Sequence, residues 1–144
     1  MAETWVVVAD SGRARFFAGD ARRGLKELDI LVAPELRQRE QALASDRPGR
    51  IDTQAAGVHS MGRPDSIKNH ERENFARRVA THIEDARRAG SIERLTLIAA
   101  PRFLGQLRAQ LSDQCSALVT CTIDKDLTAL PPARLVDHLP RYAS

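Results

Sequence analysis

The chain has 144 residues, of which 42% are hydrophobic and 28% are charged, and its formal net charge is +3. This length suits one domain with one core and leaves too little chain for a second. No stretch approaches the roughly 20 apolar residues of a membrane helix, and no basic segment followed by a long apolar run indicates a signal peptide. We therefore expect one cytoplasmic domain over residues 1–144, without membrane insertion and with Cys115 and Cys121 as free thiols.

The first 32 residues predict an antiparallel meander of three strands. Residues 5–9 form a short run of β-forming apolar residues, residues 13–18 alternate, and residues 25–32 alternate as a half-exposed strand. The intervening segments, residues 10–12 and 19–24, have turn composition. In the third strand the expected apolar face consists of Leu28, Ile30 and Val32.

Residues 33–68 predict a long irregular loop, because proline, glycine and scattered charges interrupt every periodic pattern. Residues 35–44 could form a short helix within it. A loop of this length inside a domain is uncommon and is usually functional or disordered. Residues 69–89 then predict a long helix, since apolar residues recur every three or four positions and Gly90 provides a stop signal.

The rest of the chain predicts two parallel strands and two helices. Residues 94–100 form a strand that is apolar on both faces, a helix starts at Pro101, residues 118–123 form the fifth strand, and Pro131 precedes a short terminal helix. The predicted fold is therefore α/β, with a five-stranded mixed sheet in which the antiparallel meander of the first three strands joins parallel fourth and fifth strands. This layout is ribonuclease-H-like.

This topology predicts a binding site at one edge of the sheet, where the carboxyl ends of strands one, three, four and five meet. Asp10 follows strand one, Arg102 follows strand four, and Lys125 and Asp126 follow strand five. The ordinary alternative is that these residues only cap the strand ends. The full set of expected partner-binding residues is Asp10, Arg13, Arg15, Arg47, Arg50, Arg102, Arg108, Lys125 and Asp126.

Motifs of the common enzyme classes are missing from the sequence. It has no glycine-rich nucleotide loop, no zinc-protease helix motif and no serine-hydrolase elbow. A magnesium-dependent nuclease is the one enzyme alternative, with Asp10, Glu71 or Glu73, and Asp124 or Asp126 as carboxylate ligands. Strand four ends in Ala-Ala-Pro, where a third carboxylate would be needed. We therefore expect no cofactor, no metal and no catalysis.

Five segments in a fixed order resemble the bacterial host attachment protein family. They are residues 8–15 (VADSGRAR), 46–50 (DRPGR), 71–76 (ERENFA), 99–108 (AAPRFLGQLR) and 125–128 (KDLT). The family is described as required for attachment to host cells. It is similar in fold to the middle domain of the archaeal and eukaryotic class-one peptide-chain release factor, whose Gly-Gly-Gln loop triggers peptidyl-tRNA hydrolysis. This chain has no Gly-Gly-Gln and carries GVHSMGR at residues 57–63 instead, so the resemblance does not imply peptide release.

The resemblance, the long loop and the arginine-rich edge together predict a non-enzymatic domain that binds the ribosome or another RNA-containing partner. Residues 33–68 contain six basic and five acidic residues and no aromatic residue. Contact with RNA would therefore depend on arginine–phosphate contacts and shape rather than on base stacking. A protein-interaction module that acts in host attachment is the further alternative.

Overall fold

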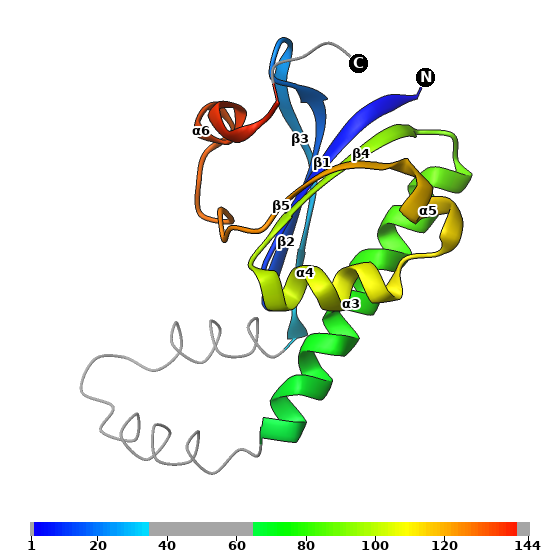
Figure 1. Cartoon of the computed structure of the whole chain (residues 1–144), viewed down its shortest axis with the longest axis vertical. Helices are drawn as coiled ribbons and strands as arrows, with labels where there is room; N and C mark the ends of the chain where they lie inside the picture. The colour runs from blue at the N-terminus through cyan, green and yellow to red at the C-terminus, as the bar shows by residue number, and fades with distance from the viewer. Residues whose placement is uncertain (1, 35–64, 141–144) are drawn as a thin grey trace, which may run out of the picture.

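The computed structural model describes residues 2–34 and 65–140 and shows one five-stranded sheet with helices on both faces (Figure 1). The strands lie in the order β3-β2-β1-β4-β5. Their bounds are β1 Glu3–Ala9, β2 Arg13–Asp20, β3 Gly24–Val32, β4 Ile92–Ala99 and β5 Val119–Ile123. The helices are α3 Asp65–Arg88, α4 Pro101–Gln110, α5 Asp113–Leu118, α6 Pro132–Leu135 and the 3-10 helix η1 Val136–His138.

The strand pairing confirms the predicted mixed sheet. β1 pairs with β2, and β2 with β3, in antiparallel fashion, whereas β1 pairs with β4, and β4 with β5, in parallel. The registers Ala9↔Ala99 and Ile98↔Ile123 align the carboxyl ends of β1, β4 and β5. Ala33 donates its backbone N–H to the carbonyl oxygen of Gly12 at 2.8 Å, so the end of β3 lies beside the β1–β2 turn.

The two faces of the sheet are covered unequally. On one face α3, α4 and α5 cover a large core, in which Trp5, Val7 and Phe16 of the sheet pack with Phe75 and Ile83 of α3. The opposite face has a smaller buried cluster, formed by Val6, Val8, Phe17, Ile98, Leu135 and Leu139. The cover is smaller on this face because α6 and η1 are only single turns and are too short to cover the whole sheet.

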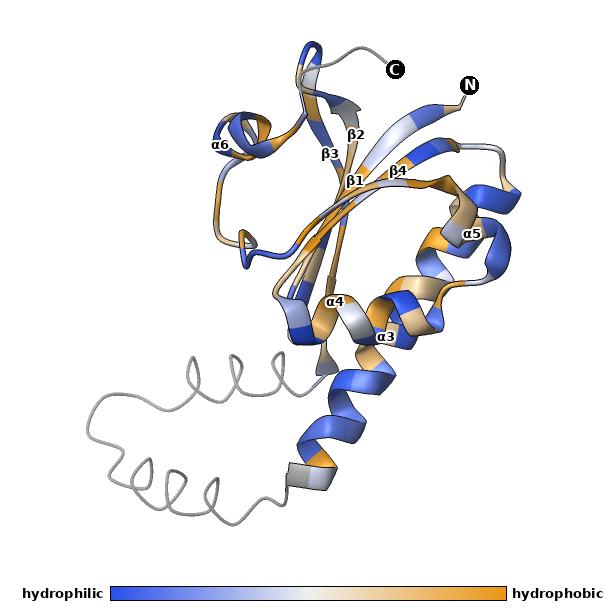
Figure 2. Cartoon of the chain, viewed as in Figure 1, coloured by the Kyte–Doolittle hydropathy of each residue, from blue (hydrophilic) through white to orange (hydrophobic). Residues whose placement is uncertain are grey.

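The helix α3 begins earlier than the sequence indicates. It starts at Asp65, so residues 65–68 are helical and the predicted end of the irregular loop at residue 68 is wrong. The first turns extend past the sheet and are mostly hydrophilic (Figures 1 and 2), and buried residues start only at Phe75. Hydrophobic periodicity therefore gives no signal there. The helix considered over residues 35–44 lies outside the described residues.

Two further expectations are corrected in detail. Leu28 and Ile30 are 41% and 48% exposed, and Leu31 packs against the core instead. A register shift in the β2–β3 pairing between Phe16 and Phe17 leaves Leu28 without a partner in β2. Beyond the shift Leu31 pairs with Ala14 of the larger core, whereas Ile30 pairs with Arg15. The helix α5 was not predicted, and Leu118 ends this helix rather than starting β5.

Candidate functional site

The predicted edge is organised around the side chain of Asp10, which directly follows β1. Its Oδ1 atom accepts hydrogen bonds from the backbone N–H groups of Gly12 and Arg13, both at 2.8 Å. These bonds close the β1–β2 turn in the way that aspartate commonly does. Its Oδ2 atom accepts a hydrogen bond from the Thr128 hydroxyl at 2.9 Å, so the segment that follows β5 is tied to the end of β1.

The Thr128 hydroxyl also connects Asp10 to Asp126. Its oxygen lies 2.5 Å from Asp126 Oδ1, and the same carboxylate oxygen accepts the Thr128 backbone N–H at 3.3 Å. A hydroxyl has only one proton, so it donates to one carboxylate at a time. The topology prediction that residues from the ends of β1 and β5 meet is therefore correct, and we call Asp10, Arg102, Lys125 and Asp126 the strand-end rim.

Arg15 has a more internal position than the sequence suggested. Its guanidinium donates hydrogen bonds to the carbonyl oxygens of Thr128 and Leu130 at 3.0 and 2.6 Å, pairs with Glu27 at 3.1 Å, and lies 5.0 Å from the centre of the Phe17 ring. The side chain is 13% exposed. These contacts clamp the segment after β5 onto the sheet and leave little of Arg15 for a partner.

The remaining predicted basic residues are distributed differently around this edge. Arg102 is the second residue of α4 and is exposed, and Lys125 is exposed in the segment after β5. Arg13 is half-buried at the start of β2, and Arg108 lies six residues further along α4 than Arg102, about 9 Å by helical rise. Arg47 and Arg50 lie outside the described residues.

The carboxylates of the nuclease alternative do not form a metal-binding group. Within residues 2–34 and 65–140, no three histidine, cysteine, aspartate or glutamate side chains are placed to hold a metal ion. Glu71 and Glu73 belong to the hydrophilic first turns of α3, whereas Asp10 and Asp126 share the Thr128 hydroxyl. The two acidic rim residues therefore act as hydrogen-bond acceptors for the local backbone and for Thr128.

Comparison with known families decides the family of this chain. Residues 5–139 match the model of a family described as "Protein required for attachment to host cells". The chain belongs to this family. The match confirms the resemblance seen in the sequence and covers every helix and strand described above except the first two residues of β1. No curated protein matches the chain. None of the described helices of this family member is long and apolar enough to cross a membrane.

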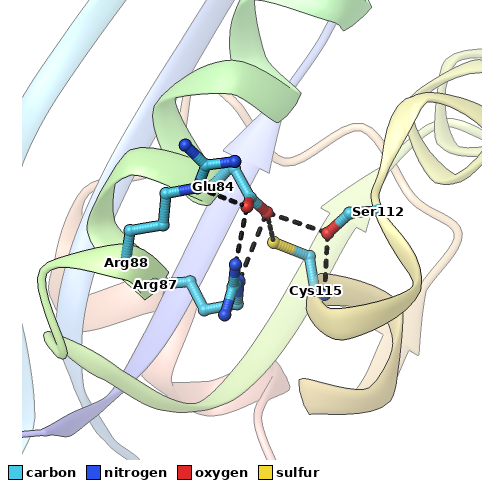
Figure 3. A network of polar contacts seen from close by, with 5 residues as sticks. All are labelled: Glu84, Arg87, Arg88, Ser112 and Cys115. Atoms are coloured by element: carbon cyan, nitrogen blue, oxygen red, sulfur yellow. Dashed lines mark hydrogen bonds and ion pairs between the residues drawn. The ribbon is translucent and has the colours of Figure 1, made fainter.

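Sequence reasoning missed a polar network between α3 and α5 (Figure 3). The Glu84 carboxylate accepts hydrogen bonds from Arg87 at 2.7 Å, Arg88 at 2.9 Å, the Ser112 hydroxyl at 2.8 Å and the Cys115 thiol at 3.0 Å. The spacing of Glu84 from the two arginines on one helix was a usable signal. No local pattern indicated the contact between Glu84 and Ser112, since the two residues are 28 positions apart.

Sequence reasoning also missed a cavity of about 430 Å³ on the sheet face that carries α6. It lies away from the strand-end rim, over the amino-terminal halves of β1, β4 and β5 and beside the β2–β3 turn. The lining includes Arg22, Arg23 and Arg94. Their separation in sequence, in two distant elements, explains why no local motif indicated them.

Proposed function

We propose that this family member is a non-enzymatic domain that binds an RNA-containing partner, such as the ribosome, through phosphate contacts at the strand-end rim. The observation that carries the proposal is the division of roles at this edge. Asp10 and Asp126 accept hydrogen bonds from neighbouring groups of the protein, whereas Arg102 and Lys125 are exposed to solvent. Arg102 and Lys125 are therefore accessible to the phosphates of an approaching partner, while Asp124 and Asp126, on either side of Lys125, are exposed as well.

The start of α4 adds to the attraction for phosphate. No side chain among the described residues caps this helix, whose N-cap residue is Ala100. The first backbone N–H groups of a helix have no partner within it and, together with the helix dipole, favour an anion. Arg102 lies in this first turn, so its guanidinium and the free N–H groups can contact the same phosphate.

The nuclease alternative has weaker support. Two-metal catalysis needs clustered carboxylates that are free to coordinate the ions. Asp10 uses both carboxylate oxygens in hydrogen bonds within the protein, and Asp126 uses one of its two. The arrangement of these carboxylates therefore favours RNA binding over metal-dependent RNA hydrolysis.

The test is the binding of RNA, measured by filter binding or fluorescence anisotropy at several salt concentrations. We expect the double variant Arg102→Ala/Lys125→Ala to bind RNA at least tenfold more weakly at low salt than the unmodified chain. The slope of log K against log salt should fall by about 0.7 for each lost phosphate contact. The control variant Lys26→Ala/Arg134→Ala removes the same charge from exposed positions on β3 and α6 and should bind almost normally.

Equal binding by the rim variant and the control variant would contradict the proposal. Absence of RNA binding by the unmodified chain at low salt would also contradict it. The latter result would favour the other reading of the family description, a protein-interaction module that acts in attachment to host cells.

A further inference from the structure

The cavity on the α6 side of the sheet is lined by basic residues that take no part in the proposed function of the strand-end rim. Arg22 and Arg23 come from the β2–β3 turn, and Arg94 comes from β4. Asp20 is the one acidic residue of the lining within the described part of the chain. Arg94 also forms an ion pair with Glu93 at 3.4 Å, so three guanidinium groups stand against two carboxylates, and the cavity keeps a small positive charge that favours an anion.

The β2–β3 turn holds its two arginines in place through the backbone. Asp20 Oδ1 accepts the backbone N–H groups of Arg22 at 2.9 Å and Arg23 at 2.8 Å. This oxygen is therefore occupied by main-chain donors. Among the described residues, neither arginine side chain has a carboxylate partner, and both are exposed. Within the described part of the chain, a ligand can therefore contact these two guanidinium groups without displacing a carboxylate.

The sheet face in the cavity carries hydroxyl groups where a covered face would carry apolar side chains. Thr4, Thr96 and Thr120 contribute to the lining, and Thr96 is buried with 5% of its surface exposed. Cys121 adds a half-buried thiol, and burial raises the pKa of this thiol, so it stays neutral near pH 7. The described lining contains no aromatic side chain, and its apolar part includes Val6 and Leu139.

We infer that this cavity binds a small phosphate ester of about mononucleotide size. Its volume of about 430 Å³ lies within the ordinary range for small-molecule sites. The planar guanidinium group of arginine donates pairs of hydrogen bonds that match the geometry of a phosphoryl group. The threonine hydroxyls can exchange hydrogen bonds with the hydroxyls of a sugar. Since the described lining residues offer no aromatic ring for base stacking, we expect recognition to depend on the phosphate and the sugar. A sugar phosphate and a nucleotide therefore share the chemistry that the cavity recognises.

The experiment measures binding of ribose 5-phosphate and AMP to the full chain by titration calorimetry, with ribose and adenosine as uncharged controls. We expect both phosphate esters to bind and both controls to fail. A second readout is the rate at which a thiol reagent modifies Cys121, which bound ligand should slow at least threefold. Cys115 is fully buried and provides the internal control for unfolding.

The variant Arg22→Ala/Arg23→Ala should weaken both ligands at least tenfold, because the turn keeps its backbone hydrogen bonds to Asp20 while it loses two guanidinium groups. The charge-matched variant Lys26→Ala/Arg134→Ala should bind within twofold of the unmodified chain. If AMP binds and ribose 5-phosphate does not, the base is recognised and the inference about sugar and phosphate is wrong.

Three other results would overturn the inference: no binding of either ester at millimolar concentration, equal weakening in both double variants, or unchanged Cys121 reactivity at saturation. RNA binding separates this inference from the proposed function. Loss of Arg22 and Arg23 should leave RNA binding unchanged, and the esters should bind normally to the Arg102→Ala/Lys125→Ala variant. If loss of Arg22 and Arg23 abolishes RNA binding, the cavity belongs to the RNA surface and the inference fails.

Discussion

The Glu84 carboxylate joins α3 to α5 through one side chain. Hydrogen bonds from Arg87, Cys115 and Ser112 hold the pKa of Glu84 well below its usual range. Ser112 is also the N-cap of α5, since its hydroxyl accepts the Cys115 backbone N–H at 3.1 Å. Burial raises the pKa of the Cys115 thiol, so the thiol acts as a neutral donor to the carboxylate. A single ionised group therefore fixes the position of a short helix.

Replacement of Glu84 by glutamine should lower the melting temperature at pH 7. Because the pKa of this carboxyl is depressed in the folded state, its stabilising contribution is complete above the ordinary value of 4.5 and is lost as the pH falls toward the folded-state value. The difference in melting temperature between the unmodified chain and Glu84→Gln should therefore narrow between pH 5 and pH 3. The exposed Glu3 provides the control as Glu3→Gln. A pH-independent difference would contradict this assignment.

Arg15 is the residue whose predicted binding role and observed contacts differ most. Arg15→Met keeps an unbranched stem over Phe17 but leaves the carbonyl oxygens of Thr128 and Leu130 without their donor. We expect a loss of about 1.5–3 kcal/mol in the free energy of unfolding, measured with urea. The exposed Arg134 serves as the control in Arg134→Met. Normal stability with weakened RNA binding would instead support the original role of Arg15 in the partner interface.

At the scale of elements, the β2–β3 turn depends on a glycine. Gly19 has φ of 130°, and a Cβ atom there would collide with the Gly24 carbonyl oxygen. Gly24 also has positive φ, at 83°, but a Cβ there would meet nothing within 4 Å. Gly105 lies within α4 with open space around it. Substitution by alanine would therefore test a backbone collision at Gly19, backbone strain at Gly24 and helix propensity at Gly105.

Alanine at each position should give three different results in urea unfolding. Gly105→Ala should stabilise the chain by about 0.5–1 kcal/mol, because glycine loses more backbone entropy in a helix. Gly24→Ala should destabilise by about 1–2 kcal/mol, which is the cost of the left-handed conformation. Gly19→Ala should destabilise more than Gly24→Ala, since the turn must shift. An equal loss in the free energy of unfolding for Gly19→Ala and Gly24→Ala would show that the collision at position 19 is relieved without cost.

At the scale of the whole molecule, the sheet separates two cores of unequal size. The larger core is covered by α3, α4 and α5, and the smaller one depends on Leu135 and Leu139 from the segment that includes α6 and η1. Few apolar contacts hold this segment, and the exposed cavity lies beside it. The α6 side should therefore open locally at lower free energy than the rest of the chain.

Hydrogen exchange can test this difference between the two cores. Leu135→Ala removes a fully buried side chain, at a cost of about 2–5 kcal/mol, and should speed amide exchange mainly in residues 124–139. Ile83→Ala, in the larger core, should speed exchange in all five strands. Similar exchange patterns in the two variants would show that the cores unfold as one unit.

The local patterns of the sequence were sufficient for the mixed sheet and for the order of its main elements. Apolar alternation and turn residues act over a few positions, so they identify strands such as β1 and β2 and the apolar part of α3. The helix α5 was missed because six residues give too short a pattern. Parallel strand direction also placed Asp10 and Asp126 correctly at one edge, since all carboxyl ends of parallel strands must meet there.

The amino-acid sequence by itself determined the fold class, the family and the shared edge, because periodicity and strand direction are properties of neighbouring residues. Only the tertiary structure decided which polar groups find partners. Arg15 and Thr128 are 113 positions apart, yet their contact turns an expected binding residue into a clamp. The cavity likewise forms only when the fold brings the β2–β3 turn and β4 to the same face of the sheet, since Arg22 and Arg23 are far from Arg94 in the sequence.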